Sequence, residues 1–372
     1  MNGFYWIYLI VFGLFIGEII SRKPERNTLL YYIACGTLIL FFVIQDASVS
    51  SDTREYMLQY SLMRYMRIEP MLHHKFEVGY NLLCKLVGAL FTGERAMFVA
   101  MALLILVPFF IWFRRESGEP MMALMSFLAL GMYYNAIVFW RQFCAMAIMT
   151  FAWRYVRERK LLPFLGLLLL AVSFHKSAVL LAAVYIAYAV PVRKWLIPVC
   201  TVCSVLLGVL GKPIMVLVYK LIYTNYRADE YFYGMGGYNM FFALWAFVLV
   251  TYWLMRERLE EPKIKLLFMM TLIAATIQPV AFSYFFWCRI VLYFRVAMVM
   301  LLPELYTAVF CQKENNKLLN LLEAHTPKLY SGVMRLYDKR WFQCTVQIAM
   351  FAVLFVWYVT ELDGAVYVMA PV

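Results

Sequence analysis

Two ionisable residues interrupt a long apolar stretch in the middle of the sequence. His175 and Lys176 divide residues 161–190 into two arms, and basic clusters stand at both ends of the stretch. Since basic residues flank membrane spans on the cytoplasmic side, the chain is expected to cross outward and return. Each arm of about 14 residues makes roughly 20 Å of helix, less than the hydrocarbon thickness of about 30 Å. The pair would therefore lie below the outer surface in a polar cavity; the alternative is one long tilted helix.

Three arginines outside the cytoplasmic clusters could bind an anionic group. Arg141 begins an apolar segment at a predicted outer turn, where snorkelling to lipid phosphates is an equal alternative. Arg289 and Arg295 share one predicted span, and their spacing places Arg295 about 9 Å deeper in the membrane. A guanidinium offers planar bidentate donors to phosphate oxygens, and Lys176 could assist. This set of cations could bind anionic lipid headgroups or a diphosphate.

The candidates for a general base are His175 and two carboxylates, Asp52 and Glu77. Loop carboxylates are usually just solvated, and these two gain interest because they are predicted to face the same compartment as the arginines. Spacing alone does not decide which of the three removes a proton. Nearby aromatic side chains could bind substrate by stacking on sugar: Tyr56, Tyr80 and Tyr293.

The composition indicates that a membrane positions these residues. Of 372 residues, 65% are hydrophobic and 15% are charged, and the charges gather in short clusters between apolar runs. Positive-inside topology explains most of the net charge of +12, and the spans separate the basic clusters, so no nucleic-acid surface is expected. Neither the Cys200–Cys203 pair nor the His73–His74 pair has the further ligands of a metal site. We therefore expect no metal and no cofactor.

The charge pattern predicts an all-α, polytopic transmembrane bundle of about twelve spans, formed by residues 1–372 as one membrane domain with both termini outside. Residues 45–95 would be an outer loop with a re-entrant or interfacial helix near 77–91, and residues 211–238 a second outer loop. Residues 311–341 would lie along the cytoplasmic interface. The predicted spans are 4–20, 29–44, 96–113, 120–138, 139–153, 161–174, 177–190, 195–210, 239–255, 264–282, 284–306 and 342–360.

Four short elements, in this order along most of the chain, resemble the EpsG family of membrane proteins, which is grouped with Wzy-type polysaccharide polymerases. The elements are Asp52–Tyr56, Glu77–Tyr80, Arg141–Ala145 and Phe174–Ala178, and the last is the most specific. The sequence departs from the family pattern at Ser51, where glycine is expected, and it matches more loosely around residues 289–294.

The resemblance implies a glycosyltransferase of the bacterial cytoplasmic membrane. It would polymerise undecaprenyl-diphosphate-linked oligosaccharides into an exopolysaccharide, capsule or O-antigen at the outer face, with a chain-length regulator and a flippase as further partners. Arg141, His175, Glu77 and Asp52 would then form the catalytic set. The alternatives are a ligase that transfers a finished glycan, a membrane O-acyltransferase, and an exporter of the lipid-linked units.

Overall fold

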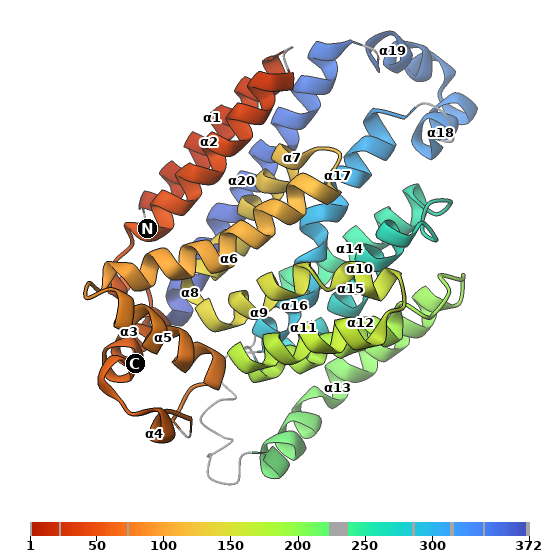
Figure 1. The fold of residues 1–372 in the computed structure, drawn as a ribbon. Helices are drawn as coiled ribbons and strands as arrows, with labels where there is room; N and C mark the ends of the chain where they lie inside the picture. The colour runs from red at the N-terminus through yellow and green to blue at the C-terminus, as the bar shows by residue number, and fades with distance from the viewer. Residues whose placement is uncertain are drawn as a thin grey trace. The chain divides into compact units, whose positions relative to one another are not determined.

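The computed structural model describes residues 2–21, 24–72, 74–222, 237–284, 287–312, 316–337 and 339–369. These residues form α-helices joined by turns and short 3-10 helices, with no β-strand among them, which confirms the all-α prediction. The chain divides into two compact units: residues 1–155, 160–179 and 319–372 form the first, and residues 156–159 and 180–318 form the second. Figure 1 shows the helices of each unit.

The first unit contains the N-terminal helices, a short amphipathic group and a long C-terminal helix. Within it α1 packs on α2, α3 on α5, and α9 on both α6 and α11 (Figure 1). Tyr8 donates a hydrogen bond of 2.9 Å to the carbonyl of Phe351, which ties α1 to the C-terminal helix. The helices are α1 (Asn2–Ile20), α2 (Pro24–Val43), η1 (Ala47–Val49), α3 (Ser51–Tyr65), α4 (Ile68–Leu72), α5 (Val78–Leu90), α6 (Arg95–Glu116), α7 (Pro120–Ala129), α8 (Met132–Val138), α9 (Trp140–Thr150), α11 (Leu161–Phe174), α19 (Pro327–Tyr337) and α20 (Arg340–Met369), with α10 (Trp153–Arg157), η2 (Lys176–Leu181) and α18 (Lys317–His325) crossing the unit boundaries.

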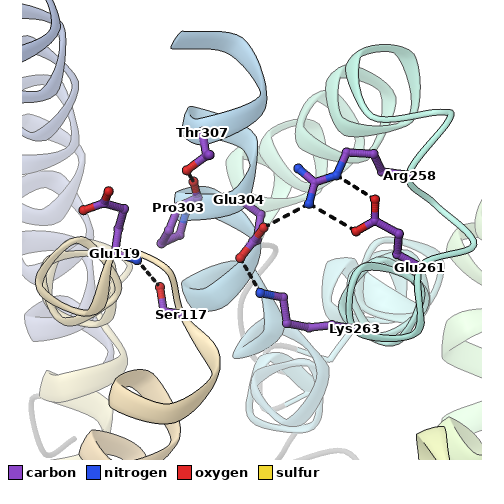
Figure 2. A network of polar contacts seen from close by, with 8 residues as sticks. All are labelled: Ser117, Glu119, Arg258, Glu261, Lys263, Pro303, Glu304 and Thr307. Atoms are coloured by element: carbon purple, nitrogen blue, oxygen red, sulfur yellow. Dashed lines mark hydrogen bonds and ion pairs between the residues drawn. The ribbon is translucent and has the colours of Figure 1, made fainter. Parts of the chain in front are cut away.

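The second unit is built around α15 (Pro262–Ile277), which packs on its neighbours α13, α14, α16 and α17. An ion network links the N-terminal end of α15 to α17. Glu304 of α17 pairs with Lys263 of α15 and, at 3.4 Å, with Arg258, and Arg258 also pairs with Glu261 (Figure 2). Two cations and two anions balance there, so the buried carboxylate of Glu304 is fully compensated. The other elements are α12 (Ala182–Ala187), α13 (Leu196–Ile222), α14 (Tyr238–Leu254), η4 (Gln278–Phe282), α16 (Trp287–Arg295) and α17 (Ala297–Phe310).

Five helices of the described residues are long and apolar enough to cross a membrane, and the number rises to seven if two bent helix pairs each count as one span. One of these pairs is α7 and α8, which meet at 62° where Gly131 adopts a φ of 70°. That left-handed conformation suits glycine because it has no Cβ. The prediction of about twelve spans is therefore not confirmed, and several predicted spans are apolar helices of 10–17 residues.

The helix ends differ from the predicted spans at two informative places. α13 continues through Pro213 to Ile222, where the sequence pattern ends a span at residue 210; residues 223–236 of the predicted outer loop lie outside the described residues. α11 ends at Phe174, and His175 follows it in an extended conformation. The alternative of one long helix through His175 is thus wrong. In the predicted interfacial segment, α18 and α19 expose Leu321 and Leu329, whereas residues 313–315 and 338 are not described.

Candidate active site

The close approach of α5 to α11 brings two of the sequence elements together. Gly79 lies in the first turn of α5, and a Cβ built on it would stand 2.7 Å from the carbonyl oxygen of Ser173 and 2.5 Å from its hydroxyl. Only glycine leaves room for backbone at that distance. The contact places Glu77, which precedes α5, beside the residues that follow the C-terminal end of α11.

Glu77 is the centre of the resulting cluster. Its Oε2 forms an ion pair with a terminal guanidinium nitrogen of Arg141, and its Oε1 lies 3.5 Å from Nδ1 of His175. The same Oε1 accepts a hydrogen bond of 3.1 Å from the backbone N–H of Lys176. That amide opens the 3-10 helix η2, where N–H groups have no partner within the helix and favour an anion.

The side chains of the cluster differ in their exposure to solvent. The side chain of Glu77 is 9% exposed, that of Arg141 is 16% exposed and that of His175 is 26% exposed. Lys176 is an exposed residue. A ligand arriving from solvent would therefore meet His175 and Lys176 first, while Glu77 supports them from behind.

The surroundings of Glu77 keep it ionised. Burial alone would raise the pKa of this carboxyl, but the adjacent His175 ring, the Arg141 guanidinium and the Lys176 amide together lower its pKa from 4.5 to about 2. A carboxylate with so low a pKa holds its charge at neutral pH and is a weak proton acceptor. It is therefore suited to orient and charge-balance its neighbours.

Aromatic rings form the wall behind Arg141. Its guanidinium carbon lies 3.9 Å from the centre of the Phe76 ring and 5.5 Å from that of Tyr56. Tyr56 in turn stacks on Trp140, with ring centres 5.5 Å apart. Arg141 occupies the first turn of α9, where the helix dipole disfavours a cation, so the carboxylate and the ring faces together compensate for this position.

The predicted site residues of the first unit fall into two groups. The structure brings Glu77, Arg141, His175 and the Lys176 amide into contact, as the sequence alone could not show. Tyr56 and Tyr80 are buried, and Tyr80 donates a hydrogen bond of 3.3 Å to the carbonyl of Tyr56, so in this conformation both build the wall of the site. Their predicted stacking on sugar remains a prediction.

Asp52 lies in the first turn of α3, one helical turn before Tyr56. Residues four apart share a helix face, so Asp52 lies on the side of α3 that carries Tyr56 toward Arg141. Its charge also suits the N-terminal end of the helix. Its catalytic role remains a prediction.

Arg289, Tyr293 and Arg295 all lie on α16 in the second unit. Tyr293 is fully buried, and Arg295 donates a hydrogen bond of 3.2 Å to the sulfur of Met240. Their predicted contacts with substrate remain a prediction.

Three residues of the site escaped the sequence analysis as site residues: Phe76, Gly79 and Ser173. Phe76 directly precedes Glu77 in the chain, and Gly79 belongs to the Glu-x-Gly-Tyr element. That element therefore already pointed to this stretch of the sequence. The position of Ser173 against Gly79 depends on tertiary packing, and no local pattern indicates it.

The model of the EpsG family matches residues 28–323, which include every element of the cluster. Comparisons with curated proteins and with solved structures gave no match. The family match covers most of the sequence, and the several apolar helices agree with a membrane protein. This membrane protein therefore belongs to the EpsG family, whose known kind is the Wzy-type polymerase.

Proposed function

We propose that this protein polymerises undecaprenyl-diphosphate-linked oligosaccharides into a surface polysaccharide by glycosyl transfer. It would act as a multi-pass enzyme at the outer face of a bacterial inner membrane, with about twelve crossings once shorter helices are included. The observation that carries the proposal is the ion pair of Glu77 with Arg141 beside His175. These three side chains supply an anion that stays charged, a cation for a diphosphate and a base of suitable chemistry.

His175 is the base in this scheme. Its Nδ1 faces the Glu77 carboxylate, so the other ring nitrogen, Nε2, is the one that can accept the proton of an acceptor sugar hydroxyl. The acceptor oxygen forms a bond to the anomeric carbon of the growing chain. The bond between that carbon and the donor diphosphate breaks, the proton rests on His175, and undecaprenyl diphosphate departs with the electron pair. Glu77 stabilises the imidazolium that forms.

Arg141 and Lys176 receive the diphosphate charge. With Glu77 ionised, the charges of Glu77, Arg141 and Lys176 sum to one net positive charge, and proton transfer to His175 adds another. Positive charge fixed near a developing phosphate anion lowers the barrier to its departure. Nε of Arg141 is buried and has no hydrogen-bond acceptor among the described residues.

The remaining predicted residues have supporting roles in the proposal. Asp52 would orient the acceptor sugar from α3, and the α16 residues Arg289, Tyr293 and Arg295 would bind the diphosphate or the sugar of the substrate. A flippase would supply the substrate and a chain-length regulator would limit the product.

The test is chain extension by the purified protein. It is incubated in detergent with a lipid-diphosphate-linked repeat unit from its host, and the products are separated by length. We expect a ladder that is lost in Arg141→Ala and in His175→Ala. Arg154→Ala and His325→Ala are matched controls, because Arg154 is an exposed arginine stacked on Tyr155 and His325 is an exposed histidine at the end of α18.

The alternatives give different products. One defined transfer to a separate acceptor would indicate a ligase, and a product that requires an acyl donor would indicate an acyltransferase. Unchanged substrate that still binds would favour an exporter. A normal ladder from Arg141→Ala or His175→Ala would refute the assigned site.

A further inference from the structure

A buried network of side-chain amides lies directly behind Glu77. Asn81 of α5 is fully buried, and its Nδ2 donates hydrogen bonds to the backbone carbonyls of Phe76, at 2.8 Å, and Met71, at 3.3 Å. Gln59 of α3 is 2% exposed, and its Nε2 lies 2.9 Å from Oδ1 of Asn81 and 2.8 Å from Nδ1 of His74. The network therefore holds the backbone at Met71 and Phe76 and the side chain of His74.

The donors and acceptors of this network follow from two backbone carbonyls. A carbonyl only accepts, so the nitrogen of the Asn81 amide must face Phe76 and Met71, and its oxygen must face Gln59. Gln59 then presents its own nitrogen to Asn81 and, by the same atom, to His74. An amide nitrogen only donates, so Nδ1 of His74 is the acceptor. Neither amide can be turned over without setting two acceptors against each other.

The held segment carries two parts of the candidate site. Phe76 ends it, and its ring lies 3.9 Å from the Arg141 guanidinium. Glu77 follows at once and forms the ion pair with Arg141. Gln59 also stands one turn after Tyr56 on α3, the helix that supplies the second ring at Arg141. The amides thus join the two elements that face Arg141.

We propose that Asn81 and Gln59, with His74 as terminal acceptor, are positioning residues that fix Phe76 and Glu77 against Arg141 for the transfer step. The inference rests on the proposed function and adds to it residues that touch neither substrate nor the reacting atoms. A positioning role predicts a fall in kcat with little change in KM, because a displacement of about 1 Å at reacting groups costs about 10²-fold in rate. It also predicts loosening of residues 71–77 that is measurable without any substrate.

The experiment combines both readouts. Asn81→Asp keeps the shape of the side chain but sets an oxygen against the two carbonyls. His74→Phe removes the terminal acceptor at a half-buried position where folding is less at risk, and His74→Gln restores an acceptor oxygen. Asn316→Leu is the control: Asn316 is a buried asparagine of the second unit that donates to the carbonyls of Ala308, Val309 and Gln312.

We expect kcat for chain extension to fall about 10²-fold in Asn81→Asp and less in His74→Phe, and to recover in His74→Gln. Hydrogen–deuterium exchange of residues 71–77 should accelerate in the first two variants and stay at the wild-type rate in His74→Gln and Asn316→Leu. Wild-type exchange in both Asn81→Asp and His74→Phe would overturn the inference, and so would faster exchange with unchanged kcat. If the wild-type protein makes no polymer, the proposed function fails, and the exchange rates alone decide whether the amides hold this segment.

Discussion

Replacing Gly79 by alanine tests whether the contact of α5 with α11 assembles the site. The new Cβ would stand 2.7 Å from the Ser173 carbonyl oxygen and 2.9 Å from its carbonyl carbon, whereas ordinary contact begins at 3.4 Å. Both atoms are backbone, so a side-chain rotation cannot relieve the clash. The two helices must separate by roughly 0.7 Å, since overpacked sites shift backbone to regain contact distance.

That separation acts on the bonds between Glu77 and the residues after α11. The Lys176 amide would move from 3.1 Å toward the limit of a hydrogen bond, and the His175 ring would withdraw from its present 3.5 Å. Overpacking of this kind costs about 1–3 kcal/mol of stability. A displacement of the reacting groups by roughly 0.7 to 1 Å lowers the reaction rate by about 10–10²-fold.

Gly88→Ala is the matched control. Gly88 lies on the same helix and is also tightly packed, but its Cβ would meet the Cγ and Cβ of Arg64 on α3, at 2.9 Å and 3.1 Å, and not the residues of α11. Thermal unfolding and the rate of chain extension are measured for both variants. We expect extension to fall at least tenfold in Gly79→Ala and to stay near the wild-type rate in Gly88→Ala. Equal rates in the two variants would refute the reasoning that this contact sets the geometry of the site.

Three further predictions concern Glu77 and Arg141. Since the pKa of Glu77 is lowered from 4.5 to about 2, its ionised form stabilises the fold above pH 4.5, and this contribution disappears as the pH falls from about 4.5 to about 2. Melting temperatures across that window should therefore fall more steeply for the wild type than for Glu77→Gln, and parallel curves would contradict the shift. Arg141→Lys should lower kcat about 10²-fold because an ammonium lacks the planar fork, and a wild-type kcat would argue against bidentate contact. Phe76→Leu should weaken the packing of Arg141 by about 1 kcal/mol, seen as a small loss of thermal stability in a protein that still inserts into the membrane. An unchanged melting temperature would show that the Phe76 ring does not stabilise Arg141.

The sequence by itself determined the class of the molecule and most of the members of its site. Apolar runs separated by basic clusters are typical of membrane helices. Two adjacent ionisable residues, His175 and Lys176, are costly inside such a helix and therefore indicate a break or a functional site. The helix indeed ends at Phe174. The family elements were also recognisable, because Glu77, Gly79 and Tyr80 keep their spacing within a single segment.

The tertiary structure decided which of these residues meet and what each can do. Glu77 and Arg141 are 64 positions apart, and Glu77 and the Lys176 amide are 99 apart, so the packing of α5 against α11, and of α11 against α9, had to bring them together. The same packing gave Glu77 three partners that keep it ionised, and left His175 more exposed. Sequence spacing could not show this, because a pKa depends on the charges and amides around a group in space and not on its neighbours along the chain.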